Sequence, residues 1–421
     1  MEQRAYGVLA VRRHLKTIRP VSGPLRAMLV GFVLGASLLF AGVCLAIVVR
    51  FGDRDSGTHR PVVQNDFVAF QAIALLAERG HPELAYDPSA VLALERELAR
   101  DPDLEWLPTA YPPWFAWMIR PLASLDVVAA YRLWVASTLG AAALVAWLVT
   151  RRWWALPLTL LMPAVAFCAA VGQNGNLSAA LLGAGMGLIR GHPVAAGIVF
   201  GLMTYKPQLA VALPFCLLAG SHFRAFASAA ATAVAIVLAS VVAFGPTPLL
   251  AFVSNLGAQA DLLFGSATHL WHRMPTVMIG VLQSTGNRTV AAALHALVAL
   301  TALAALVQIW RRTDRLDARA LGLVASMPLI SPYFFDYDLA VGIVPLALLA
   351  RRAAESGFTW LRLLVMAALW VTAPIITYAP QGWHWPIAPT VWGALLWYAL
   401  REARRSPSSR PAARTLRTGG P

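Results

Sequence analysis

Residues 27–49 read AMLVGFVLGASLLFAGVCLAIVV, a run of 23 residues without a charged side chain. About 20 apolar residues suffice for a helix to cross the hydrocarbon core of a bilayer, so this stretch predicts a membrane span. The rest of the chain continues the pattern, because 58% of its 421 residues are hydrophobic, 13% are charged and the mean hydropathy is +0.63. An ordinary soluble domain has roughly 25% charged residues. The composition therefore excludes a water-soluble fold and indicates one integral membrane bundle.

Further apolar runs follow at intervals and predict an all-α, polytopic bundle of about 10–13 transmembrane helices. They lie near residues 127–149, 153–171, 176–189, 193–205, 207–219, 225–244, 289–310, 320–331, 338–350, 362–378 and 386–400. Several runs have only about 13 residues, or some 20 Å of helix, which is too short to cross about 30 Å of hydrocarbon. Broken helices are expected there. Irregular backbone at that depth is tolerated only where it is buried in protein or lines a cavity, so the short runs are candidate positions for a site.

The chain is basic, with 34 Lys and Arg against 20 Asp and Glu, and all of the basic residues except Lys16 and Lys206 are arginine. Positive residues accumulate on cytoplasmic loops, which explains the excess without a nucleic-acid partner. If the basic tail 1–26 is cytoplasmic, 23 basic residues fall inside, ten fall outside and Arg132 falls within a span. Arg132 is expected to snorkel outward or to pair with an external acid.

This assignment of connections to the inside or the outside, the charge frame, predicts a multi-pass protein of a bacterial plasma (inner) membrane with both termini cytoplasmic. The first span reads as an uncleaved signal anchor, since no convincing small-residue cleavage site follows it. Residues 27–400 form the membrane domain, and 401–421, rich in Pro, Ser, Arg and Gly, are expected to be disordered. The three cysteines sit in apolar runs without metal or disulfide spacing and are interpreted as packing residues; they are Cys44, Cys168 and Cys216.

One long hydrophilic insertion, residues 51–110, lies outside in this frame and holds about half of the 20 acidic residues. Two amphipathic helices are expected in it. One runs from Phe67 to Arg79; the other begins with Asp87 as N-cap and reaches about Arg100. Helices of this kind lie on the membrane surface.

Asp66 stands just before the first of these helices, where it could serve as an N-cap or carry chemistry. Its polar company on the same external side favours chemistry. The polar residues that share this side are Asn65, Tyr111, Gln173, Asn176, Lys206, Gln208, His272, Arg273, Tyr333, Asp336 and Asp338. The external side was assigned from the distribution of basic residues along the chain. Apart from the few basic ones, these polar residues were not used in that assignment.

Lys206 at a helix break suggests a need for a compact, hydrated ammonium, although a snorkelling interfacial cation is the alternative. His272 and Arg273 could bind phosphate, or they could be charged residues at the rim that pair with Asp261.

Two pairs of polar side chains complete the external set. Gln173 and Asn176 are expected to hydrogen-bond substrate, since amides at a helix junction in a membrane need partners. Asp336 and Asp338 could form a second polar centre or cap a helix.

A carboxylate, cations and amides that face outward between apolar walls fit the transfer of a sugar from a lipid phosphate. ATP and nucleotide sugars are not available outside, so a lipid carrier would have to activate the donor. The carboxylate would act as general base and a cation would stabilise the departing phosphate. A transporter or lipid flippase also uses broken helices, and a scaffold for an envelope complex is the third alternative.

The order of several short motifs resembles glycosyltransferase family 87, a branch of the C-type glycosyltransferases, from about Asp66 to Leu339. The motifs are Asn65-Asp66-Phe67, Tyr111-Pro112-Pro113, Gly172-Gln173-Asn174, Lys206-Pro207-Gln208, Trp271-His272-Arg273-Met274-Pro275 and Pro332-Tyr333 to Asp336-Tyr337-Asp338-Leu339. The resemblance implies an inverting transferase with a polyprenyl-phosphate sugar as donor, usually mannose and sometimes arabinofuranose, and no metal or nucleotide cofactor.

The resemblance also carries roles onto residues. The acid of the family's first external loop acts as base and maps onto Asp66, and the family's other motifs map onto the residues just given. By the charge argument above, Lys206, His272 and Arg273 are the expected phosphate ligands. The remaining external polar residues are the expected substrate contacts, and a lipid or glycan is the expected acceptor. Tyr333 stands where mycobacterial members tend to have histidine, and the segment from Trp271 to Pro275 looks more like that of proteobacterial members.

Overall fold

The computed structural model describes residues 23–50, 66–104, 106, 111–378 and 387–405, and every element within these ranges is helical. The first half of the chain contains α2(Gly23–Arg50), α3(Phe67–Glu78), η1(Pro82–Tyr86), α4(Pro88–Ala99), α5(Pro113–Ile119), η2(Arg120–Ser124), α6(Val127–Thr150), α7(Ala155–Leu161), α8(Pro163–Ala170), α9(Gly175–Leu188), α10(Pro193–Leu202), η3(Met203–Tyr205), α11(Pro207–Ala210) and α12(Leu213–Ala219). The second half contains α13(Phe223–Phe244), α14(Thr247–Asp261), the π-helical η4(Leu262–Ser266), η5(Thr268–Arg273), α15(Val277–Thr285), α16(Arg288–Arg312), α17(Leu316–Ile330), η6(Asp336–Gly342), α18(Ile343–Ser356), α19(Trp360–Tyr378) and α20(Ile387–Arg405). The predicted all-α architecture is confirmed.

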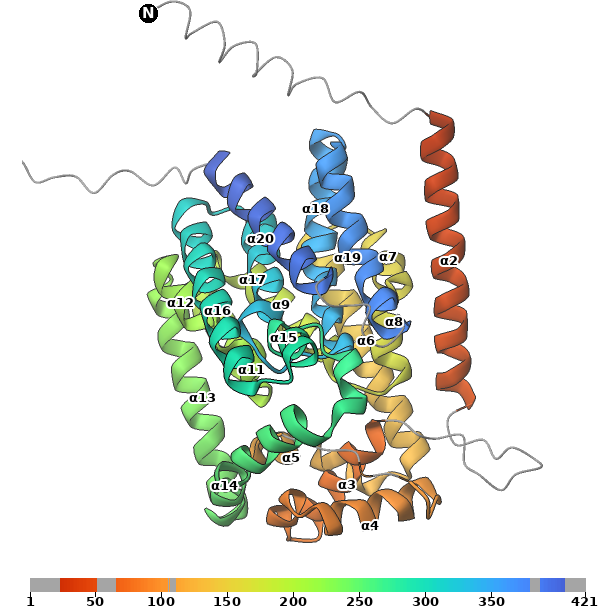
Figure 1. The fold of residues 1–421 in the computed structure, drawn as a ribbon, viewed down its shortest axis with the longest axis vertical. Coiled ribbons are helices and arrows are strands. Elements are labelled where there is room, and N and C mark those ends of the chain that lie inside the picture. The colour runs from red at the N-terminus through yellow and green to blue at the C-terminus, as the bar shows by residue number, and fades with distance from the viewer. Residues whose placement is uncertain (1–22, 51–65, 105, 107–110, 379–386, 406–421) are drawn as a thin grey trace, which may run out of the picture.

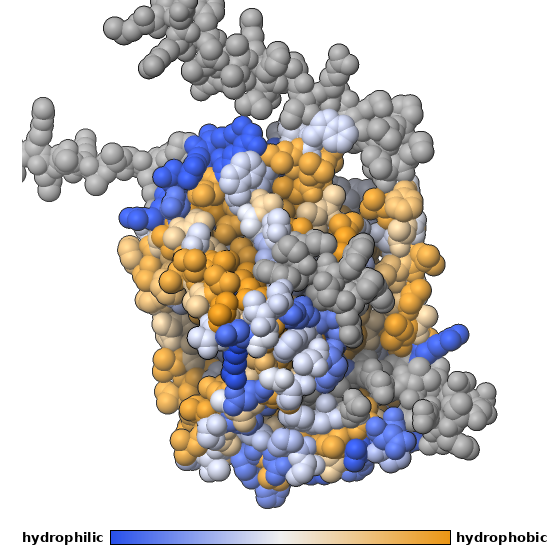
Figure 2. All heavy atoms as spheres, viewed as in Figure 1, coloured by the Kyte–Doolittle hydropathy of each residue, from blue (hydrophilic) through white to orange (hydrophobic). Residues whose placement is uncertain are grey.

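Four described helices are long and apolar enough to cross a membrane, namely α2, α6, α13 and α16. Many of their large apolar side chains face outward; for example, Leu38 on α2 is 59% exposed and Val242 on α13 is 87% exposed. Apolar side chains dominate the flank formed by α12, α13 and α16, and hydrophilic side chains gather at both ends of the visible face (Figure 2). Exposed apolar surface on this scale is suited to lipid and unsuited to water, so the chain is a multi-pass membrane protein.

Breaks occur in several apolar runs, as the sequence predicts for the short ones, although the short runs near 176–189 and 320–331 form the continuous helices α9 and α17. The run at 153–171 divides into α7 and α8, where Pro163 starts a new helix. The runs on either side of Lys206 meet at a backbone turn, because Pro207 begins α11 and cannot continue the preceding helix. Three α-helices lie outside both the predicted apolar runs and the two expected amphipathic helices, namely α5, α14 and α15. In α14, Asn255, Gln259 and Asp261 dilute the apolar pattern.

The external insertion folds around α3. Ten of the twelve residues of α3 are buried, among them Phe67 and Phe70, and they pack against α4, α5 and η2. The expectation that this helix rests on the membrane surface is therefore wrong, since protein covers nearly all of its faces. In contrast, Asp87 caps α4 as predicted, because its Oδ1 accepts hydrogen bonds from the Ser89 and Ala90 backbone N–H groups.

The two ends of the bundle differ in composition. The helices α3, α4, α5 and α14 gather at one end, whereas α2 begins and α20 ends at the other (Figure 1). At this second end, three connections predicted to be cytoplasmic meet through ion pairs. Arg315 contacts both Asp317 and Glu402, and Arg352 contacts Asp317. The arginine-rich connections thus lie together, as the charge frame requires, while the side of the membrane remains a prediction.

Three smaller expectations have clear outcomes. The described cysteines are buried and unpaired, consistent with packing roles. Arg132 donates to the Val49 carbonyl near the end of α2 at 2.9 Å and contacts no described acid. The helix α20 continues to Arg405, so the first five residues of the tail expected to be disordered are helical, and 406–421 lie outside the described residues.

Candidate active site

A cavity opens between the start of α3, the turn before α9, the α14–η5 segment and the segment before η6. Its walls are largely aromatic and apolar, with few polar groups, a composition typical of ligand sites. The lining residues are Asp66, Ala69, Phe70, Tyr111, Gln173, Gln259, Leu263, Leu270, Arg273, Tyr333, Phe335 and Tyr337.

Asp66 presents its carboxylate to this cavity instead of capping α3. Its φ of −56° and ψ of −18° are helical, whereas an N-cap residue needs an extended backbone, and its side chain accepts no capping hydrogen bond. The side chain is 21% exposed. Its Oδ2 accepts a hydrogen bond from Gln173 Nε2 at 3.0 Å and lies 3.6 Å from Arg273 Nη2. The N-cap alternative is therefore wrong.

Gln173 is held so that its amide nitrogen faces Asp66. The hydroxyl of Tyr111 donates to Gln173 Oε1 at 3.3 Å, which leaves the NH₂ group to donate to the carboxylate. Tyr111 is in turn restrained through its carbonyl, which accepts a hydrogen bond from the Tyr86 hydroxyl at 3.0 Å. A chain of three side chains thus runs from the external insertion to Asp66.

Arg273, at the end of η5, contacts two carboxylates. Its Nε lies 3.2 Å from Asp336 Oδ2 and its Nη2 lies 3.3 Å from Asp336 Oδ1, which is a two-pronged contact of the kind that a planar guanidinium favours. Its Nη2 also reaches Asp66. Asp336 is fully buried and its Oδ1 accepts the Tyr337 backbone N–H at 2.8 Å. These three side chains carry one positive and two negative formal charges.

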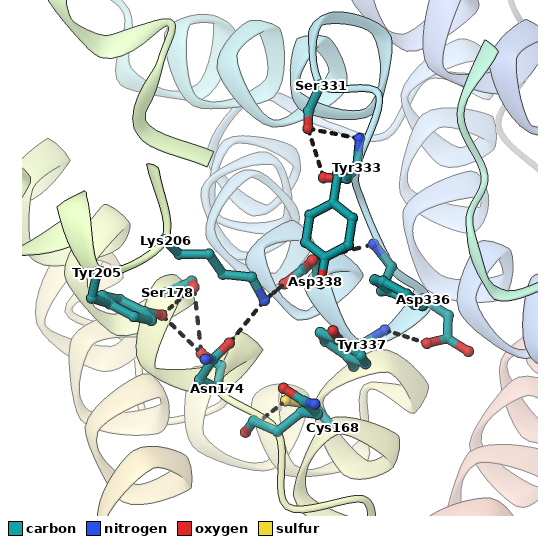
Figure 3. A network of polar contacts seen from close by, with 12 residues as sticks. Cys168, Asn174, Ser178, Tyr205, Lys206, Ser331, Tyr333, Asp336, Tyr337 and Asp338 are labelled. Carbon is teal, nitrogen blue, oxygen red and sulfur yellow. Dashed lines mark hydrogen bonds and ion pairs between the residues drawn. The ribbon is translucent and has the colours of Figure 1, made fainter. Parts of the chain in front are cut away.

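Lys206 lies in a second polar cluster next to the cavity (Figure 3). Its Nζ is 2.6 Å from Asp338 Oδ1 and donates to Asn174 Oδ1 at 2.9 Å. The side chains of Lys206 and Asp338 are only 1% and 0% exposed. Asp338 Oδ2 also accepts the Phe335 backbone N–H at 3.2 Å, so the buried pair is hydrogen-bonded on both sides, as a buried charge requires.

The two clusters are joined by a close approach of backbones at Gly175. A Cβ at this position would overlap the Tyr337 carbonyl oxygen, so only glycine lets the start of α9 pack against η6. This contact holds Asn174 and Tyr337 in place. Tyr337 lies between the two cations, with its ring centroid 4.7 Å from Lys206 Nζ and 5.6 Å from the Arg273 guanidinium carbon.

The model of glycosyltransferase family 87 matches residues 109–332, which is just over half of the chain. This chain belongs to glycosyltransferase family 87. It is accordingly a membrane glycosyltransferase. No curated protein and no solved structure matches it.

Within this family 87 glycosyltransferase, the matched range contains Tyr111, Gln173 and Arg273, whereas Asp66 and Asp336 lie beyond its two ends. The cavity therefore combines residues from inside and outside the matched range. From outside that range, Asp66 lines the cavity and Asp336 contacts Arg273 at its wall.

The cavity of the transferase brings together only part of the predicted site. Tyr333 lines it, as do Asp66, Tyr111, Gln173 and Arg273, while Asp336 supports it through Arg273. Lys206 and Asp338 do not line it; their charges are engaged with each other, contrary to the expectation that Lys206 contacts the donor phosphate. Asp336 and Asp338 were expected either to form a second polar centre or to cap a helix. Each does something of both, since each carboxylate binds a cation and also accepts a hydrogen bond from a backbone N–H group.

Three other predicted residues lie away from the cavity. Asn176 is fully buried in α9 and donates to the Val165 carbonyl at 3.2 Å, so its position corresponds to helix packing instead of substrate binding. Gln208 and His272 are partly buried but absent from the lining. Asn65 lies outside the described residues.

The sequence did not single out several lining residues. Phe335 and Tyr337 belong to the aromatic stretch around Asp336, and their alternation with the acids was the available signal. Gln259 lines the cavity from α14, which no apolar run predicted. A single glutamine in a mixed helix carries no signal that sequence alone could have used.

Proposed function

We propose that this glycosyltransferase moves a sugar, with mannose as the first expectation, from a polyprenyl-phosphate donor to a lipid or glycan acceptor by an inverting single displacement. The observation that carries the proposal is the contact between Asp66 and Arg273 at one cavity. A carboxylate and a guanidinium there can serve the two ends of the reaction, the attacking hydroxyl and the departing phosphate.

Asp66 is the proposed general base. Its polar contacts with Gln173 and Arg273 both involve Oδ2, and no described residue donates a hydrogen bond to its Oδ1. The free oxygen can take the proton of an acceptor hydroxyl while the other oxygen is held in place. Such positioned proton transfer contributes about 10²–10⁴-fold to rate.

Arg273 is the proposed ligand of the donor phosphate. When the bond between the anomeric carbon and the phosphate oxygen breaks, the phosphate leaves with one additional negative charge. A guanidinium with donors in a fixed plane stabilises that charge as it develops. Nη1 of Arg273 donates to no described residue, while Nε and Nη2 are held by Asp336.

The proposed step balances in atoms and charge. The acceptor oxygen forms a bond to the anomeric carbon from the side opposite the phosphate, and the bond to the phosphate oxygen breaks with its electron pair. The acceptor proton goes to Asp66. Inversion at the anomeric carbon follows from the single displacement.

Lys206 takes a different place in this proposal from the one that the sequence suggested. Its ammonium is buried against Asp338, which in turn accepts the Phe335 backbone N–H. We therefore assign Lys206 a structural role, in which it stabilises the segment that contains Phe335 and Asp336. The phosphate then depends on Arg273. His272, one residue earlier, remains a proposed neighbour of the phosphate whose ring would have to turn toward the cavity.

The cavity must widen to take a sugar. It encloses about 70 Å³, whereas sites for small molecules usually span about 300–1,000 Å³. One wall is formed by Leu263, which lies in the π-helical η4, and by Leu270, which lies in η5. A single turn of π-helix is a common accompaniment of functional sites, so we propose that this wall moves on donor binding.

The location of the reaction follows from charge. The arginine-rich end of the bundle is opposite the end that contains α3 and α4 (Figure 1), and positive residues favour the cytoplasmic side. We therefore propose that the cavity faces the exterior or periplasm of a bacterial inner membrane. A lipid-linked donor fits that side, because nucleotide sugars are absent from it.

The test compares lipid-linked and envelope glycans by mass spectrometry in cells that lack the gene and in cells complemented with the parent or Asp66→Asn. The expected result is loss of one glycan product and accumulation of its polyprenyl-phosphate sugar donor in the deletion and in D66N. Asp261→Asn is the matched control, since Asp261 lies on α14 near the same end, is 72% exposed and pairs with Arg288. Normal product with D66N would remove Asp66 as base; movement of a lipid-linked sugar across vesicles without a covalent product would favour a flippase.

A further inference from the structure

A basic groove lies far from the candidate active site, among the helix ends at the arginine-rich end of the bundle. It has a volume of about 620 Å³, which is within the range of small-molecule sites. Its lining residues are Ile189, Arg190, Pro193, Ser221, His222, Phe223, Arg224 and Asp314. None of them lines the cavity that contains Asp66.

The formal charge that the groove presents is positive. Arg190 and Arg224 are both exposed, and no described carboxylate forms an ion pair with either. Arg190 donates to the Asp314 backbone carbonyl, which leaves its charge unneutralised. The single acid, Asp314, is already engaged, because its Oδ1 lies 2.7 Å from Nη2 of the buried Arg319. Two arginines therefore remain to attract an anion.

His222 adds a polar group without adding charge. Arg319 Nη1 lies 2.8 Å from His222 Nε2, and a guanidinium can only donate, so Nε2 accepts and the ring is neutral at that nitrogen. Arg319 is held in place beneath the groove, since it also donates hydrogen bonds to the Trp310 and Thr313 carbonyls. Arg319 in turn holds the side chains of His222 and Asp314, next to the two exposed arginines.

The arrangement of α10 and α13 adds to the positive potential. Gly197 and Gly201 on α10 pack closely against Ala225 and Ala229 on α13, in the same order along both helices, so the two helices run parallel. Both begin at the groove, and the positive ends of their dipoles face it. The arginines provide the full charges, and the helix ends extend the same sign.

An apolar rim adjoins the charged lining. Phe223 is 63% exposed and Val194 is 53% exposed, and both stand in the first turn of the helices that begin at the groove. An anionic group could bind the arginines while an acyl chain lies along these side chains and the outer face of α13. This combination of charge and adjoining apolar surface matches a lipid better than a free ion.

We propose that this groove binds the phosphodiester head group of an acidic phospholipid in the adjacent leaflet. Arg190 and Arg224 contact the phosphate, and Phe223 and Val194 contact the first carbons of the acyl chains. Acidic lipids give the cytoplasmic leaflet its negative surface potential, and the arginine-rich end is the one that the charge frame places there. The site does not depend on the proposed sugar transfer.

The test titrates the full-length protein, purified in a neutral detergent, with phosphatidylglycerol or with phosphatidylcholine of the same acyl chains. Bound lipid is counted by native mass spectrometry and the unfolding temperature is measured in parallel. We expect phosphatidylglycerol to bind and to raise the unfolding temperature, and phosphatidylcholine to do neither. In Arg190→Gln/Arg224→Gln the apparent affinity for phosphatidylglycerol should fall about 5- to 30-fold.

The matched control is Arg311→Gln/Arg312→Gln. These arginines are exposed at the end of α16, close to Asp314 in sequence, and do not line the groove. The control should retain the parental affinity. Equal loss of affinity in both double variants, or equal binding of phosphatidylcholine, would overturn the proposal in favour of unspecific surface attraction. Full displacement of phosphatidylglycerol by equimolar inorganic phosphate would overturn it in favour of a free-anion site.

Discussion

Arg273 and Asp336 form a two-pronged contact, with Nε and Oδ2 3.2 Å apart and Nη2 and Oδ1 3.3 Å apart. The fully buried carboxylate fixes the plane of the guanidinium at the cavity wall. The orientation of the remaining donors of Arg273 is therefore set before any substrate binds, which is the condition under which a cation stabilises developing charge most effectively.

Replacement of Arg273 by lysine tests this relationship, because lysine keeps the charge and loses the planar fork. We expect Arg273→Lys to lower kcat for sugar transfer by about 10²–10³-fold, the range seen when one preorganised donor is removed. The measurement is transfer of radiolabelled sugar from a polyprenyl-phosphate donor by the purified protein. Arg288→Lys is the control, since Arg288 pairs with Asp261 outside the cavity. Parental activity in R273K would contradict the assigned role.

Removal of the Gln173 amide tests the positioning of Asp66. In Gln173→Leu the carboxylate loses its 3.0 Å donor, and a hydrogen bond to a charged group is worth about 1.5–3 kcal/mol, so kcat should fall about 10- to 100-fold. Tyr111→Phe removes only the hydroxyl that orients the amide and should cost less. Gln283→Leu on α15, outside the cavity, should leave kcat unchanged. An unchanged kcat in Q173L would separate Gln173 from the reaction.

Lys206 should be important for stability more than for phosphate binding. Lys206→Met leaves Asp338 as an unpaired buried charge, which typically costs about 3–5 kcal/mol, and the unfolding temperature in detergent should fall accordingly. Lys206→Met/Asp338→Asn removes both charges and should recover much of the loss. A K206M protein of parental stability that has lost donor binding would restore Lys206 as a phosphate ligand.

Gly175 should tolerate no side chain. A methyl group in Gly175→Ala would overlap the Tyr337 carbonyl, so α9 and η6 would have to separate, and both stability and activity should fall. Gly140 on α6 is the matched control, because a Cβ there meets no atom within 4 Å. Thermal unfolding of the two alanine variants provides the comparison, with Gly140→Ala expected at or slightly above the parent. Equal stability of both variants would show that the close approach at Gly175 is dispensable.

The sequence predicted the helices well wherever apolar runs were continuous, because lipid-facing helices must be apolar along their length. It predicted Asp87 as a cap, since capping depends on neighbouring residues only. It failed at α14, whose mixed composition carries no membrane signal, and it placed α3 on the membrane surface because an amphipathic pattern does not reveal what covers the polar face.

The site illustrates the same division between local and long-range information. Asp66, Gln173 and Arg273 were predicted as polar residues of one side, and the structure brings them to one cavity. The pairing of Lys206 with Asp338, 132 residues later, could not be read from composition or spacing. A lone lysine looks the same in sequence whether it meets a substrate or an internal carboxylate.

The contact between Asp66 and Arg273, and that between Arg273 and Asp336, also set an order in time. The ribosome makes Asp66 first and Asp336 270 residues later, so at about 5–20 residues per second the nascent chain waits roughly 15 to 50 s before the last carboxylate is present. Arg273 is itself synthesised 63 residues before its buried partner Asp336. A chain that stops before η6 therefore lacks the group that orients its guanidinium, and sugar transfer can begin only after most of the bundle has been inserted.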